Sequence, residues 1–139
     1  MQIVINKCFG GFGLSPKAQK RYAELKGIEL FFYQQTKWEY KDGIDEYTRI
    51  TDVNQNDPFV QAVTGDLGET VESLGNNYWF DGNISRDDIT LVQVVKEMKK
   101  DANGPFANLR IIDIPDGIKW EIDDYDGMES IHESHQSWG

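Results

Sequence analysis

The sequence predicts an α+β fold in which two principal helices pack on a mainly antiparallel sheet. Three observations predict it. Segments rich in β-branched and aromatic residues are typical of strands, two other segments have helical apolar spacing and capping residues, and Asp-Gly turns separate several strands. The 139 residues are enough for one domain with its own core, so we predict a single domain over residues 1–139.

The N-terminal segment predicts a strand followed by a helix. The apolar residues of "QIVIN" are all β-branched, as in a buried strand. Ser15 is a suitable N-cap and Pro16 a suitable first helical residue. Gly27 is a suitable left-handed C-cap, so the first principal helix is predicted over residues 16–26.

The next part of the chain predicts a sheet and then an irregular insertion. "GIELFFYQQ" and "TKWEYKDG" have strand composition, and the second ends in an Asp-Gly turn. Residues 44–77 mix turn residues with one short apolar patch, and we interpret them as an irregular insertion with room for one helical turn. Such a length exceeds an ordinary connection, which indicates a functional or mobile loop. Strand character resumes at "NYWFDG".

The second principal helix is predicted over about residues 86–101. Ser85 is the expected N-cap, with Asp88 three residues later as in a capping box. Apolar residues then recur every three or four positions from Ile89, which gives the helix one face to bury.

The last third of the chain predicts a hairpin and a surface tail. Residues 109–114 and 118–122 have strand character, and the Pro-Asp-Gly sequence between them is typical of a turn. Residues 128–139 can form a short helix or lie along the surface.

Composition limits the function classes. There are 24 acidic and 14 basic residues, a formal charge of −10, which disfavours binding to nucleic acid backbones and to acidic membranes. The single cysteine, Cys8, excludes an intrachain disulfide and suits a reducing compartment. No signal peptide and no apolar run near twenty residues is visible, so we expect an intracellular protein. Because Cys8 follows a strand, we interpret it as a small buried hydrophobe.

A glycine-rich loop between the first strand and the first helix is the first candidate site. Backbone N–H groups and a helix start gathered there can hold a phosphate or carboxylate. The loop lacks both the Gly-Lys-Ser/Thr of a phosphate loop and the Gly-x-Gly-x-x-Gly dinucleotide pattern, and a turn that needs positive φ is the alternative. Aromatic rings beside the loop can stack on a base, and an arginine can donate to a phosphate. The predicted ligand-binding residues are Phe9, Gly10, Gly11, Phe12, Gly13, Ser15 and Arg86.

An acidic segment near the C-terminus is the second candidate site. It can bind a basic partner or remain a solvated hairpin end. Ile122 stands where a calcium loop needs an oxygen ligand, which argues against that motif. His132 and His135 can share a helical face, but no metal site and no cofactor is predicted. The acidic residues are Glu121, Asp123, Asp124, Asp126 and Glu129.

Both ends of the chain resemble a family of small proteins encoded by tailed bacteriophages. The resemblance lies in "INKCFGGFGLSPKA" and "IPDGIKWEIDDYDGMESIHESHQSW", and it covers about residues 2–27 and 114–138. The family has no settled activity, so no catalytic residue is carried over. The resemblance implies a small protein in the cytoplasm of an infected bacterium that antagonises host defence by binding.

Two mechanisms are consistent with that context. The one that we favour from the sequence is a non-enzymatic protein that sequesters a small nucleotide-derived immune signal, because the glycine loop then has a role. The alternative is an acidic inhibitor that occupies a basic surface of a host defence nuclease or CRISPR effector, either by protein–protein binding or by nucleic-acid mimicry. An enzyme acting on nucleotides is a third class, for which no acid/base pair can be placed. A homo-oligomer with a shared pocket stays open.

Overall fold

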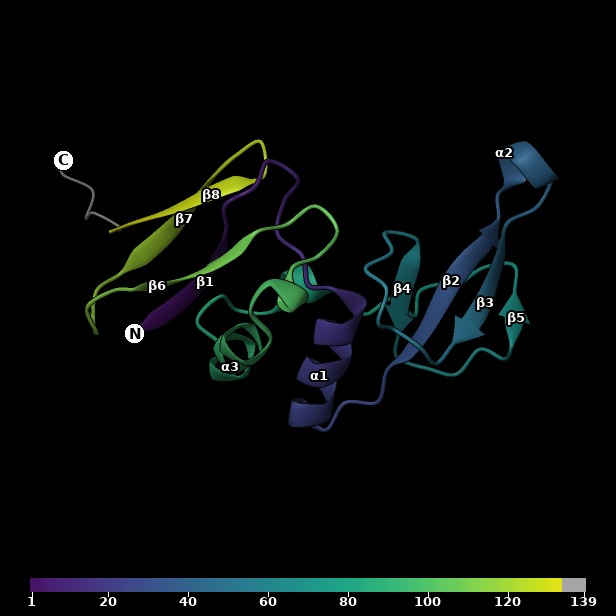
Figure 1. Cartoon of the computed structure of the whole chain (residues 1–139), viewed down its shortest axis with the longest axis horizontal. Helices are drawn as coiled ribbons and strands as arrows, with labels where there is room; N and C mark the ends of the chain where they lie inside the picture. The colour runs from purple at the N-terminus through teal and green to yellow at the C-terminus, as the bar shows by residue number, and fades with distance from the viewer. Residues whose placement is uncertain (134–139) are drawn as a thin grey trace.

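The computed structural model, which describes residues 1–133, confirms the α+β class with antiparallel sheets and two longer helices (Figure 1). Two groups of elements lie next to each other. The terminal lobe, built from both ends of the chain, contains β1 (Gln2–Asn6), α1 (Pro16–Lys26), α3 (Ile89–Met98), β6 (Leu109–Asp113), β7 (Trp120–Tyr125) and β8 (Met128–Glu133). The sheet lobe contains β2 (Phe31–Lys37), α2 (Glu39–Asp42), β3 (Glu46–Ile50), β4 (Val60–Val63) and β5 (Thr70–Val71).

The terminal lobe is organised around the antiparallel pair β1–β6, in which Gln2 lies opposite Asp113. On one face of this pair, Val4 belongs to a buried cluster with side chains of α1 and α3. Ile3 and Ile5 point to the other face and are fully buried. The β7–β8 hairpin contacts β1, so the strand pair is enclosed by helices and by the hairpin (Figure 1).

The sheet lobe is an antiparallel sheet of order β4-β2-β3-β5. Phe32 and Tyr33 point to opposite faces of β2, and each is buried in a separate cluster. Trp79 packs against the Phe32 cluster and also against the core of the terminal lobe. This shared side chain joins the two lobes.

The first helix forms as the sequence predicts. The Ser15 hydroxyl accepts a hydrogen bond from the Ala18 N–H (3.1 Å), and Pro16 is the first helical residue. Gly27 adopts φ 71°, where its N–H donates to the last carbonyls of the helix. Residues 16–26 are therefore confirmed as helical. Neither this helix nor another within residues 1–133 is long and apolar enough to cross a bilayer.

The second helix begins three residues later than predicted. Asp88, not Ser85, is the N-cap of α3, because its carboxylate accepts from the N–H groups of Thr90 and Leu91 (2.8 and 3.1 Å). Ile89, the first residue of α3, is 84% exposed and therefore lies outside the buried apolar face of the helix. α3 ends at Met98, about three residues before the predicted end near residue 101, and after the positive φ of Lys99 (55°) the chain continues as the 3₁₀ turn η2 (Lys99–Ala102).

The predictions for the middle of the chain were wrong in two respects. Residues 44–77 contain the strands β3, β4 and β5 and are not an irregular insertion. The segment "TKWEYKDG" contains the short helix α2 after the end of β2. "NYWFDG" makes only one bridge, between Tyr78 and Val63 of β4, before the 3₁₀ turn η1 (Asp81–Asn83).

The predicted pairing of the last third was also wrong. β6 pairs with β1, and β7 pairs with β8 across a turn at Asp126 and Gly127, which have φ values of 54° and 90°. The turn after β6 forms, but it does not close a hairpin. Residues 128–133 are a strand and not a helix, which also excludes the geometry of a helix-flanked calcium loop. His135 lies outside the described residues.

Candidate functional site

Four segments meet at one end of the terminal lobe and form what we call the loop cluster: residues 7–14, 80–83, 103–108 and 125–128. The Gly104 N–H donates to the Gly13 carbonyl (2.8 Å), and the Lys7 N–H donates to the Asn108 carbonyl (2.8 Å). In Figure 1 the β7–β8 turn lies beside the purple N-terminal loop. The glycine loop is thus held by three segments that are remote in sequence.

Close backbone contacts explain several of the glycines in the loop cluster. A Cβ at Gly10 would lie 2.2 Å from the Phe106 carbonyl oxygen, and a Cβ at Gly104 would lie 2.8 Å from the Gly13 oxygen. A Cβ at Gly127 would lie 2.5 Å from the Gly11 nitrogen. No side chain fits at these positions without displacing backbone. These contacts support the structural interpretation of the glycine loop.

The amide that leads from the glycine loop into α1 already has an anionic partner. The Leu14 N–H donates to Asp81 Oδ2 (2.8 Å), and Gln19 Nε2 donates to the same oxygen (3.3 Å). A cavity of about 190 Å³ lies beside the loop, and both Asp57 and Asp81 line it. No Lys or Arg is among the described residues that line this cavity. The cavity therefore presents negative charge where the sequence predicts an anion cradle.

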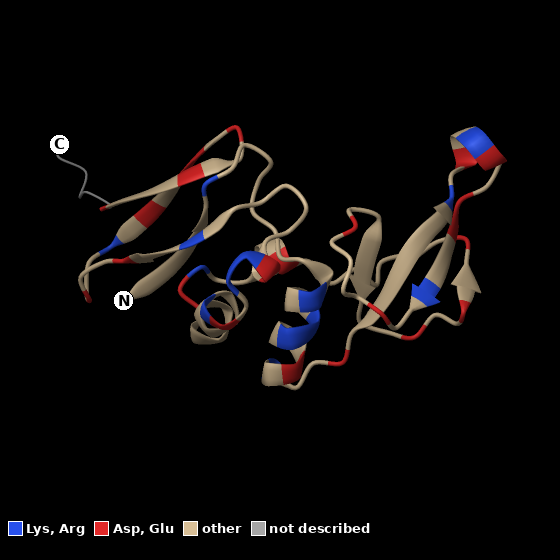
Figure 2. Cartoon of the chain, in the orientation of Figure 1, with Lys and Arg blue, Asp and Glu red and all other residues tan. Residues whose placement is uncertain are grey.

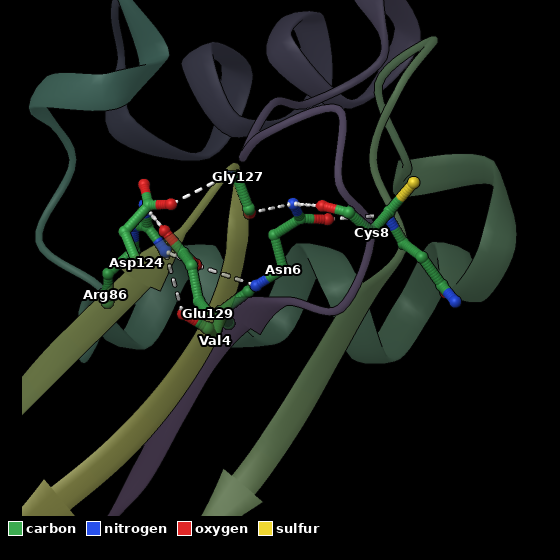
Figure 3. Close-up of polar contacts among 8 residues, drawn as sticks. Val4, Asn6, Cys8, Arg86, Asp124, Gly127 and Glu129 are labelled. Atoms are coloured by element: carbon green, nitrogen blue, oxygen red, sulfur yellow. Dashed lines mark hydrogen bonds and ion pairs between the residues drawn. The ribbon is translucent and has the colours of Figure 1, made fainter.

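Arg86, predicted to bind an anion, forms a two-pronged ion pair with Glu129. Its Nη1 and Nη2 lie 2.5 and 2.8 Å from the two carboxylate oxygens (Figure 3). The guanidinium carbon lies 3.6 Å from the centroid of the Phe12 ring. Glu129 is only 4% exposed, so the pair is largely shielded from water. The structure brings Arg86 and Phe12 together, but the charge of Arg86 is neutralised by Glu129.

Asn6, which the sequence analysis missed, connects the two ends of the chain. Its N–H donates to Glu129 Oε1 (2.8 Å), and its Nδ2 donates to the carbonyls of Cys8 and Gly127 (2.6 and 2.7 Å; Figure 3). Its Oδ1 accepts from the Asn108 N–H (2.8 Å). The side chain is fully buried, while Cys8 itself is half-buried. The sequence feature that could have indicated this role is an amide residue at the end of an apolar strand.

The predicted acidic residues divide into one buried and several exposed carboxylates. Asp124 accepts from the Gly127 N–H (2.7 Å) and supports the hairpin turn, which also contains Asp126. The ring nitrogens of His132 lie 3.3 Å from a Glu121 oxygen and 2.9 Å from an Asp123 oxygen. Within residues 1–133, no group of three or more His, Cys, Asp or Glu is arranged to hold a metal ion.

The loop cluster contains exposed aromatic side chains. Phe9 is 58% exposed, Phe106 is 61% exposed and Tyr125 is 78% exposed. The Phe9 and Tyr125 rings meet edge to face, with centroids 6.4 Å apart. Phe9 was predicted to bind a ligand, whereas Phe106, which follows a Gly-Pro pair, was missed. Ser15 instead serves the fold, because it caps α1 and its hydroxyl donates to the Asp101 carbonyl (2.6 Å).

The carboxyl of Asp81 gives the site a pH-dependent contribution to stability. Burial raises its pKa above the usual range, and hydrogen bonds from Leu14 and Gln19 offset only part of that effect. A raised pKa in the folded state stabilises the fold below the ordinary carboxyl pKa, and this contribution is lost as pH rises through the raised value. Asp81→Asn should therefore weaken the dependence of the unfolding free energy on pH over the range from the ordinary carboxyl pKa up to the raised pKa of Asp81.

Urea denaturation at several pH values measures this effect. The exposed carboxyl of Asp113 provides the control, and Asp113→Asn should leave the pH dependence close to that of the wild type. An unchanged pH dependence in Asp81→Asn would contradict the assigned role of the buried carboxyl.

Comparison of the chain with protein-family models, with curated proteins and with solved structures found no match. The resemblance of the two ends to phage proteins stays a prediction. A functional proposal therefore rests on the geometry and charge of the loop cluster.

Proposed function

We propose that the chain is a non-enzymatic binding protein that uses its loop cluster to occupy a basic surface of a partner protein. The observation that carries the proposal is the set of exposed aromatic rings on loops that also present carboxylates. Large exposed apolar groups on a soluble domain are typical of interaction sites. The proposal agrees with the inhibitor alternative from the sequence.

The aromatic residues have the properties of interface anchors. Phe9, Phe106 and Tyr125 are each more than half exposed and belong to three different segments of the loop cluster, with Tyr125 at the end of β7. Aromatic side chains contribute much of the binding energy at protein interfaces when a partner covers them. The close glycine contacts and the buried Asn6 side chain fix the loops, so little ordering is required on binding.

The charge of the site indicates the chemistry of the partner. Asp57 and Asp81 line the cavity beside the glycine loop, and exposed Asp124 and Asp126 lie at the adjoining hairpin turn. A cavity of about 190 Å³ with this lining suits a Lys or Arg side chain of the partner. The net charge of −10 would also accelerate encounter with a basic protein.

The proposed partner class combines this surface with the phage resemblance. A nuclease or CRISPR effector of the bacterial host has a basic channel for nucleic acid, which an acidic protein surface can occupy. Sequestration of a nucleotide at the glycine loop has less support, because Arg86 is paired with Glu129 and the cavity is lined by carboxylates. The inhibitor is therefore the function that the geometry supports best.

Replacing two exposed rings tests the proposal. Phe9→Ser combined with Tyr125→Ser should reduce capture of the partner at least about tenfold, since each buried aromatic anchor contributes on the order of 2 kcal/mol. Thermal unfolding should change little, because both rings face solvent. The measurement is affinity capture from bacterial lysate with the immobilised protein, followed by identification of the retained proteins and a binding assay with the purified partner.

Tyr40→Ser supplies the matched control, because Tyr40 is 87% exposed on α2 in the sheet lobe. We expect this variant to capture the same partner as the wild type. We also expect nucleic acid to compete with the purified complex and high salt to dissociate it. Equal loss of capture in the control, or a partner that keeps its nucleic acid while bound to the wild type, would refute the proposal.

A further inference from the structure

A second recessed surface lies beside α1, away from the loop cluster, and its lining combines Lys and Arg side chains with a smaller number of carboxylates. It consists of two cavities of about 350 and 360 Å³ that share one residue, Lys20. Val53 and Asn54, on the loop that follows β3, line the first cavity, and Thr51 lines the second. Lys20 therefore stands where the two cavities meet.

The second cavity has an apolar wall at the end of the sheet where β2 begins and β3 ends. Leu30, Phe32 and Ile50 line it and belong to or pack against one buried cluster. A flat ring placed on this wall would cover apolar surface that now faces solvent. Ligand cavities typically combine such a wall with a few polar groups.

The cations at the rim differ in whether they are neutralised. Arg21 pairs with Glu97 and Glu24, which both line the first cavity, and Arg49 pairs with Asp66. Lys17 lines the first cavity with Lys20, and neither lysine forms an ion pair within residues 1–133. Figure 2 shows basic residues gathered on α1, whereas the β7–β8 hairpin carries several acidic ones. In a chain with a charge of −10, this is a local site of positive charge.

We infer that the cavities beside α1 bind a phosphate monoester that carries a flat ring, the chemistry of a mononucleotide. The ring lies against the wall formed with Ile50, and the phosphate lies between the ammonium groups of Lys17 and Lys20. A dianionic phosphate can accept hydrogen bonds from both lysines, and the cavity walls reduce the screening of these contacts by water. This site is independent of the proposed partner surface, since it shares no residue with the loop cluster.

Titration of the ¹⁵N-labelled protein with adenosine 5′-monophosphate tests the inference by NMR. The nucleotide should shift the amide signals of Lys20, Ile50 and Thr51 in a saturable way. Adenosine supplies the ring alone and inorganic phosphate the anion alone, and each should bind at least about tenfold more weakly, a loss of about 1.4 kcal/mol. Equal binding of inorganic phosphate would show that the ring makes no contribution, and it would overturn the inference.

Charge reversal at the shared lysine provides the second test. Lys20→Glu should weaken nucleotide binding at least about tenfold. Lys119→Glu, at an exposed lysine between β6 and β7, should leave the affinity within about twofold of the wild type. Equal weakening in both variants, or amide shifts confined to the loop cluster, would refute the site. If Lys20→Glu lowers the thermal unfolding midpoint, the same comparison is made with Lys20→Gln, which removes the positive charge without adding a carboxylate.

Discussion

Replacing Glu129 with alanine is expected to lower the free energy of unfolding by about 3 to 5 kcal/mol, the cost of breaking a buried ion pair. The Arg86 guanidinium would lose both oxygens of its carboxylate partner while it remains largely covered. The Asn6 N–H would lose its acceptor as well. Urea denaturation measures the change, and the midpoint should fall without a large change in slope.

Glu133→Ala on the same strand is the matched control, because this carboxylate is exposed. It should change stability by less than about 0.5 kcal/mol. The double variant Arg86→Met with Glu129→Met should recover part of the stability, since apolar side chains leave no buried charge unpaired, while the Asn6 N–H still lacks its acceptor. A loss below about 1 kcal/mol in Glu129→Ala would show that the pair is exchanged for water at little cost.

Gly127→Ala is expected to destabilise the fold by about 3 kcal/mol through two effects. The residue has φ 90°, so an L side chain adds backbone strain of about 1 to 2 kcal/mol. The new Cβ would also lie 2.5 Å from the Gly11 nitrogen and the Phe9 oxygen, and such overpacking costs about 1 to 3 kcal/mol. Because the glycine loop would have to move, the amide signals of Phe9 and Gly11 should shift.

Gly117→Ala separates the two effects. Gly117 has φ 80°, but a Cβ there meets nothing within 4 Å. This variant should lose only the strain contribution, about 1 to 2 kcal/mol. Equal losses at both glycines, measured by chemical denaturation, would mean that the contact between the hairpin turn and the glycine loop contributes nothing to stability.

Local features of the fold were predictable from the sequence. The N-cap at Ser15 and the left-handed C-cap at Gly27 depend on hydrogen bonds within a few residues, so the residues near each end of α1 define where it begins and ends. The start of α3 was misplaced because Ser85 and Asp88 are both good caps, and which of them caps depends on the path of the preceding chain. Asp88 also accepts a hydrogen bond from Tyr22 on α1, a contact between helices that no local pattern reveals.

Strand pairing was less predictable because it is a property of distant segments. Residues 109–113 and 120–125 are separated by a turn and resemble a hairpin, but each pairs with another strand. The first segment is β6, and it pairs with β1, which lies near the other end of the sequence. Residues 44–77 are rich in turn residues, so their short strands were not recognised from the sequence. The side chains of these strands make their contacts only in the assembled sheet.

In the candidate site, too, features that depend on nearby residues were predictable and features that depend on distant contacts were not. The sequence located the glycine loop, the aromatic residues beside it and the acidic hairpin end, because composition alone marks them. It did not reveal that Arg86 and Glu129 neutralise each other, since an arginine that binds a phosphate and one that pairs with a buried carboxylate have the same local pattern. Phe106 and Asp81 were missed because their roles depend on contacts with the glycine loop.

The hydrogen bond from Asn6 to Glu129 joins residues that are 123 positions apart, and this separation has a consequence for synthesis of the chain. At ordinary translation rates the ribosome needs roughly 6 to 25 s to make the intervening residues. The sheet lobe, from Phe31 to Val71, can pair its strands during that time because they are contiguous. The apolar first strand leaves the ribosome before them, yet its partners are made last. In the nascent chain, β1 is therefore the segment that a chaperone would protect.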